Sequence, residues 1–200
     1  MGITVLFGGT FNPPHIAHRK MLEAVSKIDN IDKIFVVPTN IPPHKEVDGF
    51  CAPVEDRLNM CRLLSDGIDK AFVSDMEIKR GGKSYTYDTL TNLLKSYENI
   101  YLLVGGDMIT SFDTWYRFKD ILKLCGIFAV RRVGIDDNKF DNAVENLRQL
   151  GGYITVVDAE LPEISSTEIR NTLGNNKKKE LQKVLPHNIC DYIVKRKLYR

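Results

Sequence analysis

The most constraining feature of this sequence is the change of pattern across residues 3–25. Ile3–Phe7 is a short alternating run rich in β-branched and aromatic residues, which predicts a buried strand. The run stops at Gly8-Gly9, and from Pro14 onward apolar side chains recur at the three- and four-residue spacing of a helix. In doubly wound α/β folds, a strand, a glycine turn and a helix start in this order bind phosphate. Free backbone N–H groups and the positive end of the helix dipole then face the anion, and the glycines allow positive φ and close backbone approach.

Two histidines stand at the start of this expected helix. His15 and His18 are three residues apart, so both imidazoles can reach the same phosphate chain. The turn before them fits neither the G-x-G-x-x-G dinucleotide fingerprint nor the G-x-x-x-x-G-K-[ST] P-loop. On these residues alone, ordinary surface histidines and a metal-binding pair both stay open, although no third ligand at a recognisable spacing accompanies them.

Strand-like and helix-like runs alternate along the rest of the chain. Strands are expected at 33–38, 71–73, 100–104, 126–130 and 153–157, and helices at 53–65, from 84 onward, at 140–150 and at 185–199. This alternation predicts an α/β fold that is Rossmann-like and doubly wound, with a mostly parallel sheet and helices on both faces. The length and the 43% hydrophobic content suit one domain over residues 1–200, with a small helical portion from about residue 165.

Several charged residues between or beside these elements are expected to be solvated. The inward side chains of the helix at 53–65 are expected to be Leu58, Cys61 and Leu64. Arg57 and Arg62 of the same helix are expected to face solvent. The basic, glycine-bearing stretch 79–83 is expected to be a solvated loop.

Polar or aromatic residues follow several of the expected strands. Asn40 and Lys45 lie in the proline-rich loop after the second strand, Asp107 follows the clearest buried strand, and Arg131 follows the next one. Because ligands of open α/β sheets bind at the carboxyl ends of the strands, these positions are candidates for ligand contact. Asp107 could hold ribose hydroxyls or could cap a helix. The only tryptophan, Trp115, has polar flanks that predict a partly exposed rim.

A second helix start lies near the end of the sequence. Ser165 and Glu168 have the spacing of a capping box, which predicts the first turn of a helix. Arg170 follows one turn into that helix, and its forked donors suit phosphate oxygens. The segment is either an ordinary helix start or a second anion site.

Composition narrows the classes of partner. The net charge of +2 does not indicate a nucleic-acid partner and favours a small ligand. The four cysteines lack C-x-x-C or metal-type spacing, and no signal-peptide core or apolar run long enough to span a membrane is present. We therefore expect a cytoplasmic protein with reduced thiols and no membrane partner, and a homo-oligomer is left open.

The motifs carry a family resemblance that covers essentially the whole chain. G-G-T-F-N-P-P-H-I-A-H resembles the G-G-T-F-D-P-x-H-x-G-H signature of the HxGH nucleotidyltransferase superfamily, with Asn12 and Ala17 as departures. Residues 164–170 match that superfamily's I-S-S-T-x-I-R motif. The P-P-H-K, S-Y-T-x-D-T-L and T-W-Y segments are similar to those of bacterial nicotinate-nucleotide adenylyltransferases, which narrows the superfamily considerably.

This resemblance implies an enzyme that transfers AMP from ATP to nicotinate mononucleotide, giving deamido-NAD and pyrophosphate in NAD synthesis. It implies catalytic roles in stabilising the triphosphate for His15, His18 and Arg170. Residues expected to bind ATP are Gly8, Gly9, Thr10, Phe11, Ser165, Ser166 and Thr167. Residues expected to bind the mononucleotide are Asn40, Lys45, Thr86, Asp107, Trp115 and Arg131. Mg²⁺ is expected to bind mainly through the ATP phosphates, with no metal ligand from the protein. A pantetheine-phosphate adenylyltransferase and a non-catalytic nucleotide-binding module are the alternatives.

Overall fold

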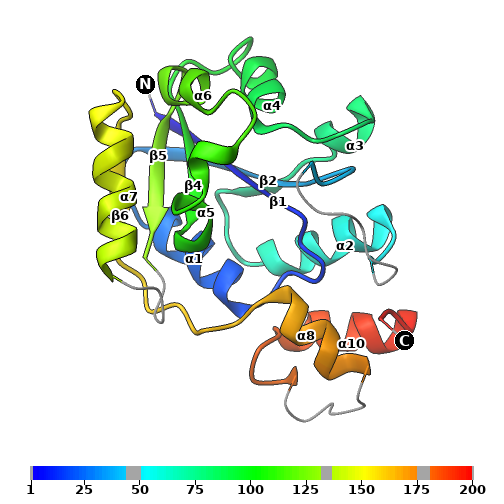
Figure 1. The fold of residues 1–200 in the computed structure, drawn as a ribbon. Coiled ribbons are helices and arrows are strands. Elements are labelled where there is room, and N and C mark those ends of the chain that lie inside the picture. The colour runs from blue at the N-terminus through cyan, green and yellow to red at the C-terminus, as the bar shows by residue number, and fades with distance from the viewer. Residues whose placement is uncertain (1, 44–50, 132–136, 175–180, 200) are drawn as a thin grey trace.

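The computed structural model describes residues 2–43, 51–131, 137–174 and 181–199, and in these the expected strands and helices alternate (Figure 1). The strands are β1 (Ile3–Gly9), β2 (Ile31–Pro38), β3 (Ala71–Val73), β4 (Ile100–Gly105), β5 (Gly126–Val130) and β6 (Ile154–Val157). The helices up to β5 are α1 (Ile16–Ser26), α2 (Val54–Ser65), α3 (Met76–Arg80), α4 (Thr86–Leu93), α5 (Gly106–Ile109), the 3-10 turn η1 (Phe112–Thr114) and α6 (Phe118–Leu124). Later in the chain come α7 (Asp137–Gln149), α8 (Ser166–Gly174) and α10 (His187–Arg196).

The six strands form one sheet in the order β3-β2-β1-β4-β5-β6, and every neighbouring pair is parallel. The strand order reverses between β1 and β4, which are neighbours in the sheet although most of the first half of the chain separates them. Such a reversal leaves a crevice at the carboxyl ends of the two central strands, where ligands of doubly wound sheets bind. The predicted α/β class is therefore confirmed, and the sheet is wholly parallel.

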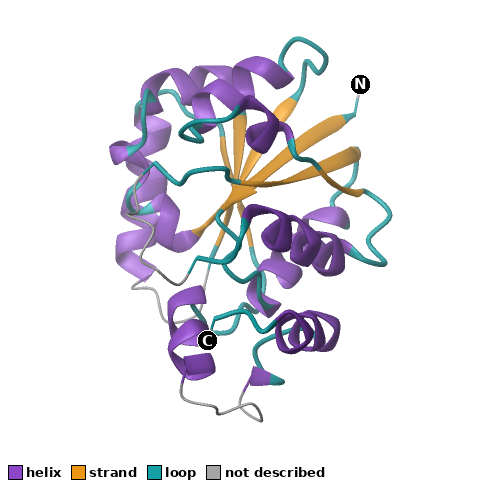
Figure 2. Ribbon diagram, turned by 90° about the vertical axis from the view of Figure 1, so that its right-hand side faces the viewer, coloured by secondary structure: helices purple, strands orange, loops and turns teal. Residues whose placement is uncertain are grey.

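Both faces of the sheet are covered by helices, as Figure 2 shows for the strands lying between two helical layers. Val5 and Phe7 of β1 belong to the core beneath α1 and α2, whereas Leu6 belongs to the core beneath α4, α6 and α7. Alternate residues of a strand point to opposite faces, so a central strand that is covered on both sides must be apolar throughout. This requirement explains the continuous apolar run in β4.

Two expectations about local structure were wrong. The first helix begins at Ile16, with His15 in extended conformation as its N-cap, and not at Pro14. The first residues of the expected loop at 79–83 lie in α3, where the backbone N–H of Lys79 donates to the Asp75 carbonyl at 2.8 Å and an exposed ion pair of 3.1 Å joins the two side chains. Gly81, at φ 72°, ends that turn where a residue with a side chain would be strained.

The expectation for Arg57 was also wrong. Its side chain is 1% exposed, and its guanidinium donates to three backbone carbonyls, whereas Arg62 is exposed as expected. Arg57 precedes Cys61 by four residues and Leu64 by seven, which places all three on the buried face of α2. Burying a charge is tolerable here because each of the guanidinium nitrogens has a carbonyl partner.

The last described helices lie at the carboxyl side of the sheet, beside the loop between β1 and α1 (Figure 1). Tyr199 follows α10 and is 7% exposed, and its hydroxyl donates to Asn12 Oδ1 at 2.8 Å. The same oxygen accepts the backbone N–H of Ala52 at 3.0 Å. Asn12 therefore joins the first loop to two distant parts of the chain.

A close approach at Gly126 provides a test of the fold. A Cβ atom added to Gly126 would lie 2.5 Å from the ring of Tyr101, which stacks on Phe128 with ring centroids 4.5 Å apart. We predict that Gly126→Ala lowers the free energy of unfolding by about 1–3 kcal/mol, as overpacking does in well-packed cores. Denaturant unfolding measures this change. The same substitution in a Tyr101→Ala background should cost much less, and an equal cost in both backgrounds would contradict the steric explanation.

Candidate active site

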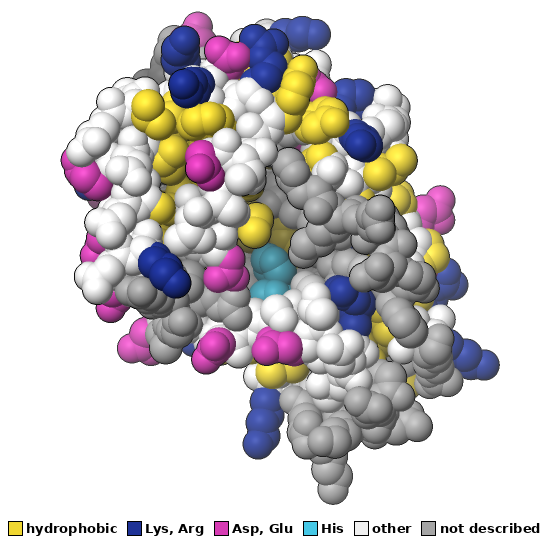
Figure 3. All heavy atoms as spheres, viewed as in Figure 1, with side chains coloured by type: hydrophobic (Ala, Val, Ile, Leu, Met, Phe, Trp, Pro, Cys, Tyr) yellow, Lys and Arg dark blue, Asp and Glu magenta, His cyan; other side chains and the backbone are white. Residues whose placement is uncertain are grey.

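A cavity of about 670 Å³ opens at the carboxyl ends of β1 and β4. Residues from the loop after β1, from α1, from the start of α4, from the β4–α5 junction and from the start of α8 line it. Figure 3 shows histidine side chains deep in the corresponding hollow of the molecular surface. Its place is that expected from the reversal of strand order, so the sheet topology alone accounts for where the hollow lies.

The glycine pair makes room for a ligand, although its backbone geometry differs from expectation. Both glycines end β1, and the positive φ of this turn lies at Phe11, at 49°, and not at either glycine. A Cβ atom added to Gly8 would meet nothing within 4 Å, whereas one added to Gly9 would lie 3.1 Å from the Phe11 ring. Gly8 therefore leaves open space in the cavity, while Gly9 lets the Phe11 ring pack against the backbone.

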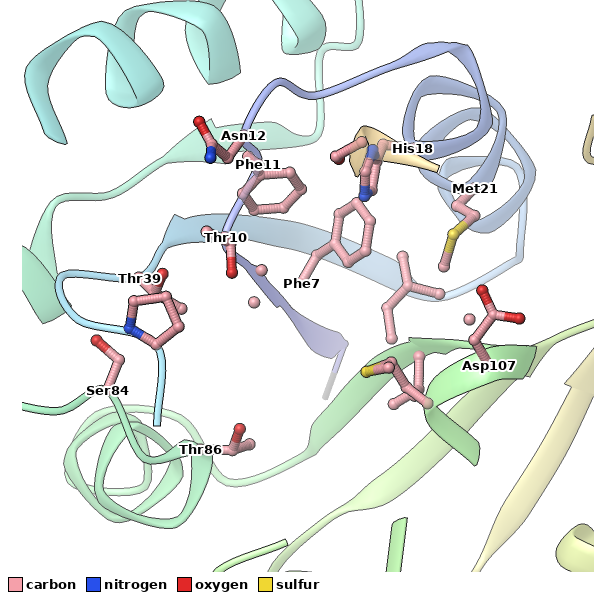
Figure 4. A pocket seen from close by; sticks show the side chains of 18 of the residues that line it. Phe7, Thr10, Phe11, Asn12, His18, Met21, Thr39, Ser84, Thr86 and Asp107 are labelled. Atoms are coloured by element: carbon pink, nitrogen blue, oxygen red, sulfur yellow. The ribbon is translucent and has the colours of Figure 1, made fainter. Parts of the chain in front are cut away.

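His15 and His18 hold one another at the start of α1. The backbone N–H of His15 donates to Nδ1 of His18 at 3.2 Å, and the two residues form a reciprocal capping box. The ring centroids are 3.8 Å apart, and the Phe11 ring lies edge-on to His18 at 5.1 Å (Figure 4). Because Nδ1 accepts a hydrogen bond, the proton of a neutral His18 lies on Nε2. Both imidazoles line the cavity, as the sequence predicted.

The start of α8 forms a second wall of the cavity. The backbone N–H of Ser165 donates to the Glu168 carboxylate at 2.8 Å, and the backbone N–H of Glu168 donates to Ser165 Oγ at 3.2 Å, so the predicted capping box is confirmed. Arg170 donates from Nη1 to the carbonyl of Asn12 at 2.9 Å, and Ser166 Oγ donates to the carbonyl of Pro13 at 2.9 Å. These bonds fix α8 against the loop after β1.

The opposite side of the cavity is aromatic and contains another helix start. Thr86 is the first residue of α4, and Figure 4 shows it across the cavity from His18. Trp115 is half-buried and stacks on Phe112 with ring centroids 4.8 Å apart, which agrees with the expected rim position. Asp107 is exposed in the first turn of α5 and lines the same cavity. The N-cap residue of α5 is Gly105, so Asp107 is not the residue that caps this helix.

Of the residues predicted to bind the mononucleotide, Asn40 and Arg131 do not line this cavity, and a third is not described. The side-chain Nδ2 of Asn40 donates to the Gly82 carbonyl at 3.1 Å. Arg131 forms ion pairs with Asp137 at 2.9 Å and Asp141 at 2.7 Å. Lys45 lies outside the described residues. A role in binding remains a prediction for all three.

One acidic residue of the cavity was not predicted. Glu77, on α3, is 4% exposed and accepts a hydrogen bond from the Thr89 hydroxyl, which in turn accepts one from Arg80 Nη1 at 3.0 Å. Burial raises the pKa of the Glu77 carboxyl, and the Thr89 hydrogen bond and the Arg80 charge oppose that rise only in part. The sequence offers no signal for this position, because its burial depends on how α3 packs beside α4.

Among the described residues, no group of three or more His, Cys, Asp or Glu side chains is arranged to hold a metal ion. None of the helices in the described ranges is long and apolar enough to cross a membrane. The cavity instead combines two helix starts, two imidazoles and a guanidinium on one side with an aromatic rim on the other. Such an arrangement suits a polyanion joined to a flat ring system.

A fold and a site of this kind are those of an α/β nucleotidyltransferase, and comparisons with known proteins agree. A family model described as cytidylyltransferase-like matches residues 6–172. Probable nicotinate-nucleotide adenylyltransferases from Listeria welshimeri and Fusobacterium nucleatum are 36% and 37% identical to this chain. These matches cover 97% of this chain and 95% of the Listeria protein, and 85% and 86% for the Fusobacterium protein. The chain therefore belongs to the nicotinate-nucleotide adenylyltransferase family of cytidylyltransferase-like proteins.

Solved structures extend the comparison to the fold. Nicotinic acid mononucleotide adenylyltransferase from Plasmodium falciparum matches with TM-scores of 0.80 for its complex with APC and 0.81 for its complex with NaAD. The match covers 100% of this chain and 98% of the Plasmodium chain at 21% and 22% identity. The likeness is therefore one of fold along the whole chain.

Glu77 generates a prediction about pH. The raised pKa means that the folded state holds this proton more tightly than the unfolded state, whose carboxyl titrates near 4.5. The resulting stabilisation is complete below about pH 4.5 and is lost as the pH rises through the folded-state pKa. Glu77→Gln resembles the protonated carboxyl, so its stability relative to the wild type should rise with pH by up to about 1.4 kcal/mol per pH unit within that window.

Urea unfolding of both proteins between pH 4.5 and 8 measures this difference. The exposed Glu98 offers a matched control, because Glu98→Gln also removes one carboxyl but from a solvated position. Its curve should run parallel to that of the wild type. A constant difference between Glu77→Gln and the wild type across the whole range would contradict the raised pKa.

Proposed function

We propose that this protein transfers AMP from ATP to nicotinate mononucleotide, releasing pyrophosphate and forming deamido-NAD for NAD synthesis. One observation carries the proposal: a single cavity combines the starts of α1 and α8, with His15, His18 and Arg170, on one side and Trp115 with the start of α4 on the other. The first side suits the triphosphate of ATP, and the second suits a pyridine nucleotide. The names of the curated relatives support the same activity.

The chemistry of the reaction asks for the groups that line this cavity. The phosphate of the mononucleotide attacks the α-phosphorus of ATP, a new P–O bond forms, and the bond from the α-phosphorus to the β-bridging oxygen breaks. Because the attacking phosphate is already ionised, the reaction needs alignment and stabilisation of the departing pyrophosphate more than it needs a base. We assign that stabilisation to His15, His18 and Arg170. The remaining ATP contacts are assigned to Gly8, Gly9, Thr10, Phe11, Ser165, Ser166 and Thr167.

We assign the mononucleotide to the aromatic side. The Trp115 indole offers a face for the pyridine ring, the backbone N–H groups at Thr86 suit its carboxylate, and Asp107 suits ribose hydroxyls. Asn40, Lys45 and Arg131 are proposed to bind the mononucleotide when substrates are present. For Arg131 this role would require its guanidinium to leave Asp137 and Asp141.

Mg²⁺ is proposed as the cofactor, held mainly by the ATP phosphates and water. The described residues offer no cage of three acidic or histidine ligands, which fits an ion carried by the substrate. When bound, the ion neutralises charge on the phosphate oxygens. A cytoplasmic setting is proposed as well, because the four cysteines, all within the described residues, form no disulfide and three of them are buried.

A substitution at His18 tests the triphosphate side. We predict that His18→Ala lowers kcat by about a hundredfold or more, as the loss of one preorganised donor commonly does. Pyrophosphate release with ATP and nicotinate mononucleotide measures the effect, and circular dichroism checks that the variant is folded. The exposed His187, which pairs with Asp191, provides the control His187→Ala with normal turnover expected. Normal turnover in folded His18→Ala would remove this residue from the triphosphate site.

Acceptor choice tests the mononucleotide side and the activity itself. We predict that nicotinate mononucleotide is preferred over its amide analogue by at least about a hundredfold in kcat/KM, because helix-start donors lose a charged acceptor when the amide binds. The same assay includes phosphopantetheine as a third acceptor. Pyrophosphate release only with phosphopantetheine, or with no acceptor at all, would overturn the proposed function.

Trp115 should govern binding of the pyridine ring alone. We predict that Trp115→Ala raises KM for the mononucleotide and leaves KM for ATP nearly unchanged, and that Trp115→Phe recovers part of the loss by restoring a stacking face. Steady-state kinetics with each substrate varied in turn measures both constants. A defect confined to ATP would mean that the pyridine lies elsewhere in the cavity.

A further inference from the structure

The buried guanidinium of Arg57 connects segments that carry the two sides of the cavity. Nη1 donates to the carbonyl of Thr10 at 2.9 Å, and Nη2 donates to the carbonyl of Asn40 at 3.2 Å. Nε lies 3.3 Å from the carbonyl of Ala52, just before α2. Within the described ranges no carboxylate forms an ion pair with Arg57, so the hydrogen-bond partners of its guanidinium are backbone carbonyls of loops.

The first of these carbonyls belongs to the triphosphate side. Thr10 lies in the loop between β1 and α1 and lines the cavity next to Phe11, whose ring contacts His18. A shift of Thr10 would therefore move the peptide that supports the imidazole side of the site.

The second carbonyl leads to the opposite side. The backbone N–H of Asn40 donates to Ser84 Oγ at 2.8 Å, and the backbone N–H of Ser84 donates to the carbonyl of Ile41 at 2.9 Å. Ser84 lies two residues before Thr86, where α4 begins. Figure 4 shows Ser84 beside Thr39 at this end of the cavity. The start of α4 is thus tied to the segment that Arg57 holds.

We propose that Arg57 is a positioning residue that sets the distance and orientation between the two substrate subsites. This inference rests on the proposed function, in which atoms bound on opposite sides must meet in line. One rigid plane of donors fixes the Thr10 and Asn40 carbonyls relative to each other, and a lysine ammonium, although charged, cannot reproduce that fork. Misplacement by about 1 Å can cost a hundredfold in rate while each substrate still binds.

The variants Arg57→Lys and Arg62→Lys form a matched pair on α2, because Arg62 is exposed and bonds only to Asn59 among the described side chains. We expect Arg57→Lys to lower kcat by at least about tenfold. The Kd of an unreactive ATP analogue and the Kd of nicotinate mononucleotide, each measured alone, should change by less than about threefold. Arg62→Lys should match the wild type throughout. A normal kcat in Arg57→Lys, or a loss that appears equally in the two Kd values, would overturn the inference.

A double-mutant cycle separates positioning from a general loss of stability. Ser84→Ala removes the acceptor of the Asn40 N–H and so breaks the connection between Arg57 and the start of α4, and it also removes a hydrogen bond to the Glu77 carboxyl. If the two residues act through one connection, the double variant should lose much less kcat than the product of the single losses. Independent effects would argue that Arg57 only stabilises the fold. Should Arg57→Lys fail to fold, the kcat and Kd values of Ser84→Ala alone decide between the same two outcomes.

Hydrogen exchange provides a readout that does not depend on turnover. In Arg57→Lys the amides of Asn40 and Ser84 should exchange faster, while the amides of β4 stay protected. Unchanged protection at both amides would overturn the inference even in an active enzyme. A third result would separate the two proposals. If these amides exchange faster but the wild type releases no pyrophosphate with any acceptor, the proposed function is wrong, while the link from Arg57 through Asn40 to Ser84 is supported.

Discussion

A loop that is proposed to bind phosphate must keep its carbonyl oxygens away from the anion, and in this chain four donors from distant segments bind the carbonyls at the end of β1 and in the loop after it. A carbonyl oxygen carries partial negative charge and repels phosphate, so each one needs a donor elsewhere. The carbonyls of Gly9, Thr10, Asn12 and Pro13 accept hydrogen bonds from the Thr39 N–H, Arg57, Arg170 and Ser166 respectively. Those donors come from the β2 side of the sheet, from α2 and from α8, so the geometry of one short loop depends on most of the fold.

The sheet order explains why a site with two different sides forms here. Because β1 and β4 are adjacent while their connections run to opposite faces, the segments after them diverge and leave a hollow between. The segment after β1 contributes backbone N–H groups and imidazoles, whereas the segment after β4 contributes Asp107 and leads to Trp115. Each side can therefore bind a chemically distinct partner. The distance between the sides is then a property of the tertiary structure and not of any single motif.

Much of the fold and part of the site follow from local sequence. The strand pattern at Ile3–Phe7, the capping box at Ser165 and the apolar face of α1 depend on neighbours within one turn or one strand, and the structure confirms them. The burial of Arg57 could also have been predicted from the sequence, because its spacing of four residues to Cys61 places it on the buried face of α2. Treating a charged residue as exposed by type alone concealed that signal.

Other features depend on contacts that no local pattern encodes. Glu77 is buried because α3 packs against β2 and lies beside α4, where the Thr89 hydroxyl donates to its carboxylate. Arg131 follows β5 as expected, yet two aspartates from α7 hold its guanidinium. A pattern predicts which strand end a residue follows, but the partner of a charged side chain there is chosen by the packing of separate elements.

The hydrogen bond from Tyr199 to Asn12 spans 187 residues of sequence, so the two residues are synthesised at very different times. The ribosome releases the chain from its first residue onward, so the loop after β1 emerges long before the residues that hold it. Arg170 and then Tyr199 reach Asn12 only after α7 and β6 have left the exit tunnel. A nascent chain can therefore form contacts among its strands before Arg170 and Tyr199 are able to reach Asn12.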